Sequence, residues 1–384
     1  MSAMSRWLPF VAGCAALIAR PAAAQSIFDS EARTAPQFMQ YRLGAPANET
    51  VSQLAIPLFV SMPLSSHLTV DIGTSYARSL STGDNGRSEL NGLTDTQVRG
   101  NLTLGSDYVV LTAGLNLPTG TSGVTLDQFA VASRIANDFL AFPIANMGTG
   151  FAGTGGIAVA RPLGDWNLGL GAAIRRATSY EPFNIPSQSL TFTPGNEYRM
   201  RVGVDRLVGS GRLAFGLTVS KFGEDDAGGS RLRSGNRFIG QTVYNTTVGG
   251  NDLVLGAYDV LRSAGQYASG ASLGRENVAN LFGTLGLHPN GRVVEPTLEL
   301  RHWMQDIPES GSGAGAVAAH TQSSYLGSVG VRTRMELGGV AIYPGVGYTV
   351  GSLATTDLSG ASARAGLTGF KMQIAMRAAP FAEP

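Results

Sequence analysis

The sequence has very little charge, almost no lysine and a single cysteine. Charged residues make up 14% of its 384 positions, against roughly a quarter in ordinary soluble domains. Lys221 and Lys371 are the only lysines and the net charge is +1, so nothing indicates a nucleic-acid partner. Cys14 is the only cysteine. A chain that loses it has no thiol for a disulfide or for a thiolate metal site.

No apolar run in the chain is long enough for a transmembrane helix. At the N-terminus, Arg6 precedes about 13 mostly apolar residues, fewer than the roughly 20 that a spanning helix needs. Ala22-Ala-Ala24 follows, and this arrangement predicts a secretory signal peptide over residues 1–24, cleaved after Ala24. Val11-Ala-Gly-Cys14 is also typical of the box before a lipidated cysteine, an alternative that stays open. Export without cysteine or helical spans is typical of the outer membrane of Gram-negative bacteria.

Strand-like alternation takes the place of helical spans. In residues 369–377, GFKMQIAMR, the apolar Phe370, Met372, Ile374 and Met376 alternate with polar or small residues. Successive side chains of a strand point to opposite faces, so this segment has one oily and one polar face. The pattern recurs in segments of about ten residues between Gly, Asn and Asp turn residues. The segments interpreted as strands are 37–43, 51–62, 67–78, 93–105, 107–118, 150–161, 165–176, 197–206, 211–222, 237–248, 251–262, 276–288, 292–304, 323–335, 339–351 and 364–377.

These segments predict an all-β fold, a transmembrane antiparallel up-and-down β-barrel of about 16 strands. Fourteen or 18 strands are alternatives, because residues 237–262 alternate weakly. The barrel is expected over residues 37–377, after a short N-terminal segment at 25–36 and before a tail at 378–384. Connections of about three to five residues alternate with connections of about seven to thirty, as periplasmic turns and outer loops do. The alternative is a soluble sandwich or propeller, which predicts apolar faces packed on each other.

Aromatic residues test the register independently. Membrane barrels carry tyrosine and tryptophan on the lipid face at the level of the headgroups. Four tyrosines fall on the predicted outward face near the outer-loop ends of their strands, and one tryptophan falls outward at the opposite rim. These residues are Tyr76, Tyr198, Tyr325, Tyr348 and Trp166.

The opposite parity defines a lumen face that is rich in arginine. Rings of cations favour anions in a narrow passage of low dielectric constant, so this lining predicts a mild anion preference. The alternative is that the arginines pair with acidic residues and brace the wall. With Arg377 the lining holds nine cations and four anions. The residues expected to line the pore are Asp71, Arg99, Arg175, Arg199, Arg201, Asp205, Glu295, Glu299, Arg301, Arg332, Arg334 and Lys371.

The longest predicted outer loop, residues 120–150, contains a short amphipathic helix. Thr125 and Gln128 have capping-box spacing, and apolar residues recur at intervals of three and four. Two placements stay open. The loop folds into the barrel mouth as a constriction or apolar docking surface, or it lies across the outer loops as a cap. The residues assigned to the constriction loop are Leu126, Phe129 and Phe139.

The sequence shows no spacing typical of a metal or phosphate site. The four histidines are scattered, and His67 and His288 lie beside predicted periplasmic turns. There is no His-x-x-x-His metal spacing and no phosphate loop. We therefore expect no enzyme activity, no metal and no cofactor. A barrel enzyme stays an alternative, because such sites assemble from different strands.

Two neighbouring segments carry a family resemblance. Gly92-Leu-Thr-Asp-Thr96 opens one predicted strand and Leu117-Pro-Thr-Gly120 ends the next. They resemble the G-[LI]-x-D-T and L-P-T-G motifs of bacterial outer-membrane transport barrels of the meta-pathway phenol-degradation type, which are distantly similar to fatty-acid and aromatic-hydrocarbon transporters. The resemblance covers about thirty residues. It implies passive uptake of small, partly apolar molecules, and it implies structural roles for Asp95, Pro118 and Gly120.

The sequence thus predicts a passive outer-membrane channel or transporter for small solutes, partly apolar or anionic ones among them. The alternatives are a non-conducting surface or envelope-structural barrel, such as an adhesin, and a barrel enzyme. The expected partners are outer-membrane lipid, a small-molecule solute and the barrel-assembly machinery, which would bind the C-terminal strand.

Overall fold

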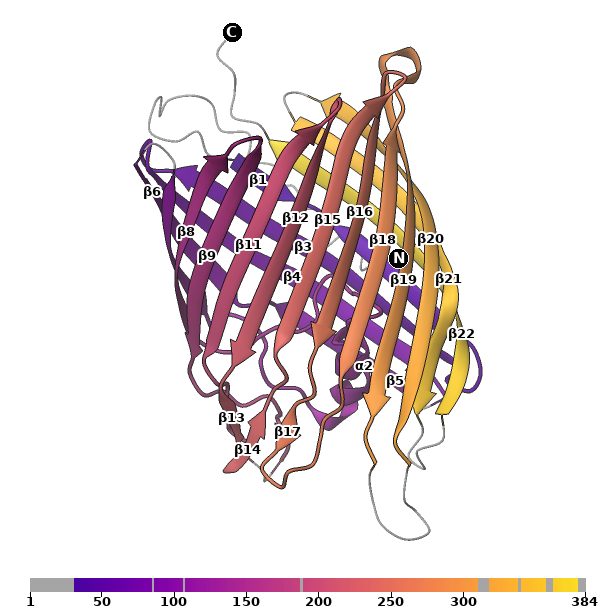
Figure 1. Ribbon diagram of the computed structural model, residues 1–384. Coiled ribbons are helices and arrows are strands. Elements are labelled where there is room, and N and C mark those ends of the chain that lie inside the picture. The colour runs from indigo at the N-terminus through magenta and orange to yellow at the C-terminus, as the bar shows by residue number, and fades with distance from the viewer. Residues whose placement is uncertain are drawn as a thin grey trace.

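The computed structural model describes residues 31–84, 86–105, 108–186, 189–309, 318–337, 340–356 and 362–378. These residues form a closed antiparallel β-barrel with steeply tilted strands (Figure 1). The predicted signal peptide at 1–24, with Cys14, and the chain beyond Ala378 lie outside the described residues. Among the residues described, no helix is both long enough and apolar enough to cross a membrane.

The described elements follow one another as an almost unbroken series of strands. They are β1 (Glu31–Thr34), β2 (Gln37–Leu43), β3 (Glu49–Pro63), β4 (Leu68–Gly83), β5 (Gly86–Leu93), β6 (Thr96–Leu104), β7 (Val109–Leu117), η2 (Leu126–Gln128), α2 (Phe129–Ile135), β8 (Ala152–Leu163), β9 (Trp166–Ala177), β10 (Phe192–Thr193), β11 (Glu197–Val208), β12 (Gly211–Phe222), β13 (Glu224–Ala227), β14 (Ser230–Arg233), β15 (Arg237–Val248), β16 (Asn251–Arg262), β17 (Gln266–Tyr267), β18 (Glu276–Gly286), η3 (Pro289–Gly291), β19 (Val293–Ile307), β20 (His320–Leu337), β21 (Val340–Thr356) and β22 (Ser362–Ala378).

Sixteen strands close the barrel. The main sheet has 18 segments, but β1 and β2 keep one register against both β3 and β22, so they form a single strand interrupted at Ala35-Pro36. The segments β5 and β6 likewise form one strand against β4, with one extra residue between Leu93 and Gln97, a β-bulge. The prediction of about 16 strands is confirmed. The first strand begins at Glu31, inside the segment expected to precede the barrel.

Tight hairpins join the strands at one end of the barrel. Strands β15 and β16 meet at the pair Val248 and Asn251, with Gly249 and Gly250 as the two turn residues. Their φ angles of 58° and 79° lie in the left-handed region that glycine adopts without steric cost. The sequence predicts this turn, and the long connections lie at the opposite end.

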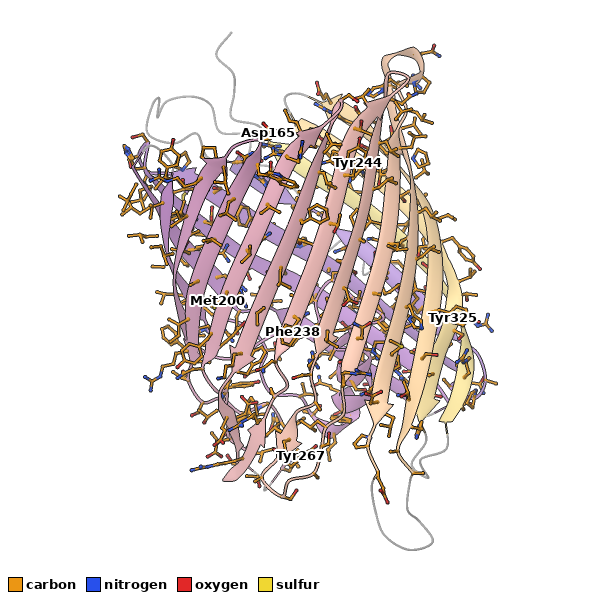
Figure 2. The ribbon with its side chains drawn as sticks, viewed as in Figure 1. Asp165, Met200, Phe238, Tyr244, Tyr267 and Tyr325 are labelled. Carbon is orange, nitrogen blue, oxygen red and sulfur yellow. The ribbon has the colours of Figure 1, made fainter. Side chains whose placement is uncertain are left out.

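The outward face is a continuous apolar surface. Val329, Tyr348 and Phe370 lie side by side in one ladder row, and all three are exposed. Exposed apolar side chains continue around the wall, with Met200 and Tyr325 among them (Figure 2). Such an exterior is stable in lipid and not in water. The chain is therefore an outer-membrane β-barrel, and the alternative of a soluble sandwich is wrong.

Aromatic rings stand on this lipid face. Tyr198 and Tyr325 are about half exposed, at 50% and 52%. At the rim with the tight turns, Trp166 packs against the guanidinium group of Arg206, 5.1 Å from the ring centroid. These rings occupy the positions that the register predicts for an aromatic girdle.

A second sheet of four short strands lies in the outer loops. It consists of β10, β13, β14 and β17 (three of them labelled at the bottom of Figure 1). The sequence predicts only loops here, because strands of two to four residues have too few positions for a visible alternation.

Candidate functional site

The longest outer loop, residues 118–151, folds into the barrel rather than across its mouth. Its helix α2 lies within the outline of the wall (Figure 1). Val131, Phe139 and Leu140 of this loop are fully buried. They pack in one apolar cluster with side chains of β2–β5 and β18–β22. The loop therefore fills one side of the lumen, and we call it the inward loop.

Buried polar side chains of the wall hold the backbone of the inward loop. Gln53 is fully buried, and its side chain accepts from the amide of Ile144 at 2.9 Å and donates to the carbonyl of Ile144 at 2.8 Å. The Arg301 guanidinium donates to the carbonyl oxygen of Phe139 at 2.6 Å. Because buried backbone groups are costly when unpaired, these bonds fix the path of the loop along the wall.

Two ion pairs add to this attachment. Arg134 of α2 pairs with Glu49 of β3 at 2.8 Å. On the other side of the loop, Asp138 pairs with Arg262 of β16 at 3.3 Å. The inward loop is thus tied to β3 and to β16 at the C-terminal end of its helix.

The two motif segments meet at the base of this loop. Asp95 accepts hydrogen bonds from the amides of Gly120 at 3.0 Å and Thr149 at 2.7 Å, and from the side chain of Asn116 at 2.8 Å. Gly120 is packed so closely that a Cβ atom would lie 1.9 Å from the carbonyl oxygen of Met147. The bulge, the aspartate and the glycine therefore clamp the two ends of the loop together. This clamp explains in physical terms why these residue types stand at this spacing.

Replacing Asp95 by alanine is expected to release the inward loop while the barrel stays folded. Three donors lose a charged acceptor, and each buried donor left unpaired costs about 1–3 kcal/mol. The measurement is the rate of chymotrypsin cleavage within residues 118–151 of the purified protein in detergent. Asp71→Ala removes a lumen carboxylate away from the loop base and is the matched control. Equal protection of D95A and the unchanged protein would contradict the clamp.

The three residues assigned to the constriction lie in different surroundings. Phe139 is fully buried in the apolar cluster. Leu126 and Phe129 are 69% and 54% exposed, and Phe129 lies 6.2 Å, centroid to centroid, from Phe183 of the neighbouring outer loop. The residues that α2 buries are Val131 and Ile135. The buried face of the helix therefore differs from the predicted one, which contains Phe129. Only Phe139 docks on the wall, and the other two form an apolar patch at the outer mouth.

The twelve residues expected to line the pore share the face of the ladder that meets the inward loop, and their role as a pore lining stays a prediction. Directly paired residues of an antiparallel ladder point to the same face of the sheet. Following these pairs from strand to strand places the twelve residues on the same face as the side chains that contact the inward loop. Five ion pairs use seven of the twelve residues, while Asp71 is bonded to Ser61 and Asn101. The ion pairs are Arg199–Glu197, Arg212–Asp205, Arg301–Glu299, Arg332–Glu295 and Arg334–Glu336.

The lumen face carries more acidic residues than the alternation indicates. On the described strands it holds thirteen cations and ten anions, so the positive excess is three instead of five. The added residues lie mostly near strand ends, beyond or at the limits of the predicted segments. Continuing the alternation to each strand end identifies them: Glu31, Arg33, Glu49, Glu197, Arg212, Arg237, Asp252, Arg262, Glu276 and Glu336.

Four arginines on the lumen face have no ion-pair partner among the described residues: Arg99, Arg175, Arg201 and Arg237. The first three lie on strands β6 to β12, which contribute no residue to the apolar cluster of the inward loop, and Arg237 lies on β15. One ladder row runs from Arg99 through Gly114 and Thr154 to Arg175. Arg201 faces a glycine on the neighbouring strand. We call this side of the lumen the open lane.

Tyr180 packs at the outer end of the open lane, in the loop between β9 and β11. Its ring meets Phe192 edge to face with centroids 5.8 Å apart. Burial raises the pKa of the Tyr180 hydroxyl above its ordinary value, so this group stays neutral at physiological pH and adds no charge to the mouth.

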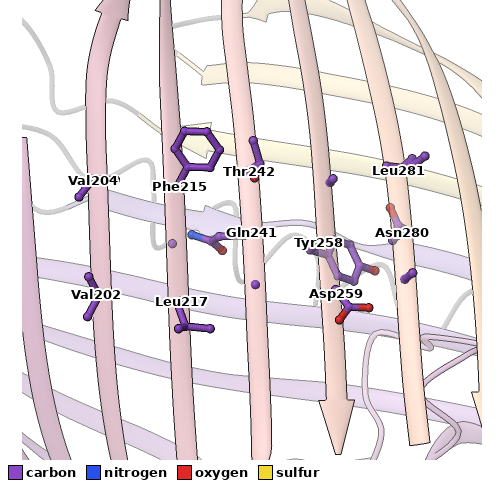
Figure 3. A pocket seen from close by; sticks show the side chains of 14 residues that line it. Val202, Val204, Phe215, Leu217, Gln241, Thr242, Tyr258, Asp259, Asn280 and Leu281 are labelled. Carbon is purple, nitrogen blue, oxygen red and sulfur yellow. The ribbon is translucent and has the colours of Figure 1, made fainter. Parts of the chain in front are cut away.

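Hollows occur on both faces of the wall. One of about 580 Å³ opens on the lipid face, where Phe215, Leu217 and Leu281 frame smaller residues of β15 and β16 (Figure 3). Its rim is mostly apolar, with Asp259 as the charged residue, and it faces lipid, so it offers no path through the barrel. Another hollow, of about 380 Å³, lies in the lumen and is lined by Ala141 of the inward loop and by Lys371 of the wall. We call it the lumen pocket.

No family model and no curated protein matches the sequence. Solved structures that match in shape include an outer membrane channel from Pseudomonas putida F1, with 13% identity, a TM-score of 0.37 and coverage of 94% of this chain and 98% of that one. An anion-selective porin from Comamonas acidovorans has 13% identity, a TM-score of 0.40 and coverage of 91% and 98%. OmpT of Vibrio cholerae, an outer-membrane protein, has 9% identity, a TM-score of 0.43 and coverage of 92% and 98%.

Proposed function

We propose that this outer-membrane barrel is a passive channel for small solutes with a preference for anions. The observation that carries the proposal is the open lane, where Arg99, Arg175 and Arg201 face the lumen without an ion-pair partner among the described residues. A structural barrel has no need of unpaired cations on its inner wall. In a passage of low dielectric constant, such charges raise the local concentration of anions.

The inward loop confines the solute path to this lane. It covers the side formed by β2–β5 and β18–β22, so a solute that crosses the barrel passes along the remaining wall, β6 to β15, which contains the open lane. A guanidinium group interacts more strongly with an anion there than in bulk water, because the lower dielectric constant screens the charges less. A narrow and one-sided basic passage therefore selects by charge as well as by size.

The outer mouth suits partly apolar solutes. Leu126 and Phe129 expose apolar surface beside Phe183, where a ring or a short hydrocarbon chain can rest before it enters the lane. The resemblance to the phenol-degradation transport type supports the same class of solute.

A structural barrel and an enzyme are the competing functions. Ion pairs such as Arg332–Glu295 favour bracing of the wall, but they leave the open lane unexplained. Gly270-Ala-Ser-Leu-Gly274 has the spacing of a nucleophile elbow, yet it lies in an outer loop without a following helix, and the Ser272 hydroxyl accepts a hydrogen bond from the Gly274 amide at 3.1 Å. Among the described residues, no three His, Cys, Asp or Glu side chains gather as a metal site.

The test is electrical. The purified chain is inserted into a planar lipid bilayer between two KCl solutions that differ tenfold in concentration. We expect discrete conductance steps and a reversal potential of the sign set by chloride, because the lane is basic. Absence of steps, or a reversal potential of the sign set by potassium, would contradict the proposal.

A further inference from the structure

We propose that the lumen pocket is a binding subsite for a small aromatic monocarboxylate. This inference rests on the proposed channel function and names a ligand class for one subsite in the lumen, outside the open lane. The pocket lies on the lumen side of β2, β16 and β18–β22, and Ala141 of the inward loop belongs to its lining. Its volume of about 380 Å³ falls within the range of small-molecule sites, roughly 300–1,000 Å³.

Lys371 supplies the charge that selects an anion. Its side chain lines the pocket and makes no hydrogen bond or ion pair with any residue that the structure describes. It stands on the lumen face of β22, between Met39 of β2 and Gly347 of β21 in the ladder. A lysine that is partly withdrawn from water and has no partner gains most from an anionic ligand.

The other charges around the pocket are already compensated. Arg301 pairs with Glu299, and the side-chain amide of Asn280 donates to the same carboxylate at 2.5 Å. Arg332 pairs with Glu295 at 2.5 Å. The pocket therefore has one net positive charge, which a monoanion neutralises. A dianion would bring a second negative charge toward Glu299, so a monocarboxylate is favoured.

The rest of the lining favours a ring. Tyr41, Tyr258 and Phe282 contribute aromatic surface to the pocket, and aromatic ligands stack edge-on or offset against such rings. Two buried polar atoms of the same lining, Arg301 Nε and Asn280 Oδ1, have no hydrogen-bond partner among the described residues. Buried polar atoms without a hydrogen-bond partner are unusual in protein cores and common where a ligand supplies the missing hydrogen bonds.

The loop and the pocket form one structure. Ala141 has a φ of 47°, a conformation that alanine rarely adopts, and it lies beside Phe139, whose carbonyl oxygen accepts from Arg301 at 2.6 Å. The same arginine thus holds the loop tip with one nitrogen and Glu299 with another. These contacts hold Ala141 in the lining of the pocket, where its methyl group adds apolar surface.

Equilibrium dialysis of radiolabelled benzoate against the full-length chain in detergent tests the inference. We expect saturable binding that benzyl alcohol, which lacks the charge, and inorganic phosphate, which lacks the ring, do not displace. Lys371→Met is expected to weaken benzoate binding at least tenfold, and Lys371→Arg to retain it within threefold. Lys221→Met is the matched control, because it changes the other lysine, on the outward face of β12, and is expected to leave binding unchanged.

Reductive methylation with ¹³C provides a second readout, since the sequence has two lysines. Benzoate is expected to shift the dimethyl-lysine NMR signal that K371M removes and to leave the signal that K221M removes. Benzoate affinity that is equal in K371M and the unchanged protein would overturn the inference, and so would equal binding of phosphate. Dialysis does not require conduction. Binding without conductance would therefore contradict the channel alone, and anion-selective conductance without binding would contradict the subsite alone.

Discussion

Removing the inward loop is expected to raise the single-channel conductance roughly threefold, because sixteen strands enclose an aqueous channel when nothing fills their lumen. The deletion takes out residues 124–146 and joins Gly123 to Met147 through two glycines. The two ends already lie together, since a Cβ atom on Gly148 would lie 3.0 Å from the amide nitrogen of Ser122. Asp95 keeps its bonds to the retained loop base. The measurement is the conductance step in planar bilayers at fixed salt concentration.

A deletion outside the lumen is the control. Shortening the hairpin of β13 and β14, which belongs to the sheet in the outer loops, is expected to leave the step within about a fifth of its original size, because this sheet does not line the lumen. Heat-modifiable migration on a gel shows whether each variant still forms a barrel. A folded loop deletion with unchanged conductance would show that the inward loop is not the constriction.

Reversing the charge of the open lane is expected to reverse the ion preference of the channel. In the triple variant Arg99→Glu, Arg175→Glu and Arg201→Glu, three unpaired cations on the lumen face become three anions. The positive excess of three on that face then becomes a negative excess of the same size. Because fields in a narrow passage are focused, the reversal potential in a KCl gradient should change sign. We also expect the change in reversal potential to become smaller at high salt concentration, because screening shortens the range of the charges.

The same change of net charge at the outer loops provides the control. Arg87, Arg231 and Arg233 are exposed and pair with acidic residues outside the lane. Their replacement by glutamate is expected to alter the reversal potential by a few millivolts at most, because exposed charges are screened within about one Debye length. A triple lane variant that keeps its anion preference would show that solutes do not pass along β6 to β12.

The barrel and its two faces follow from local sequence patterns. The alternation in residues 369–377 places Phe370 and Lys371 on opposite faces, and turn residues such as Gly249-Gly250 give the register. Both signals are local, because the face and the register of a residue can be inferred from the residues next to it in the sequence. The limits of the strands were harder to predict, since β1 and the outer ends of β3 and β20 carry polar residues outside the membrane that resemble loops. For this reason alternation alone does not identify Glu31 and Glu49 as lining residues.

The placement of the inward loop depends on contacts between distant parts of the chain. The sequence indicates a helix near Phe129, but the direction of the loop depends on Gln53, Arg301 and the clamp at Asp95. These groups are distant from the helix in sequence, and their bonds form only when the barrel has closed.

Charge pairing was likewise decided by the tertiary structure. Alternation placed the predicted arginines on the lumen face, and it treats Arg201 and Arg301 alike. In the folded protein Arg301 is paired with Glu299 and bound to the loop, while Arg201 has no ion-pair partner among the described residues. The physical reason is that the face of a side chain depends on strand periodicity alone, whereas its partners depend on which strands and loops become neighbours. The sequence by itself therefore determined the wall of this protein, and the tertiary structure decided which part of its lumen is open and charged.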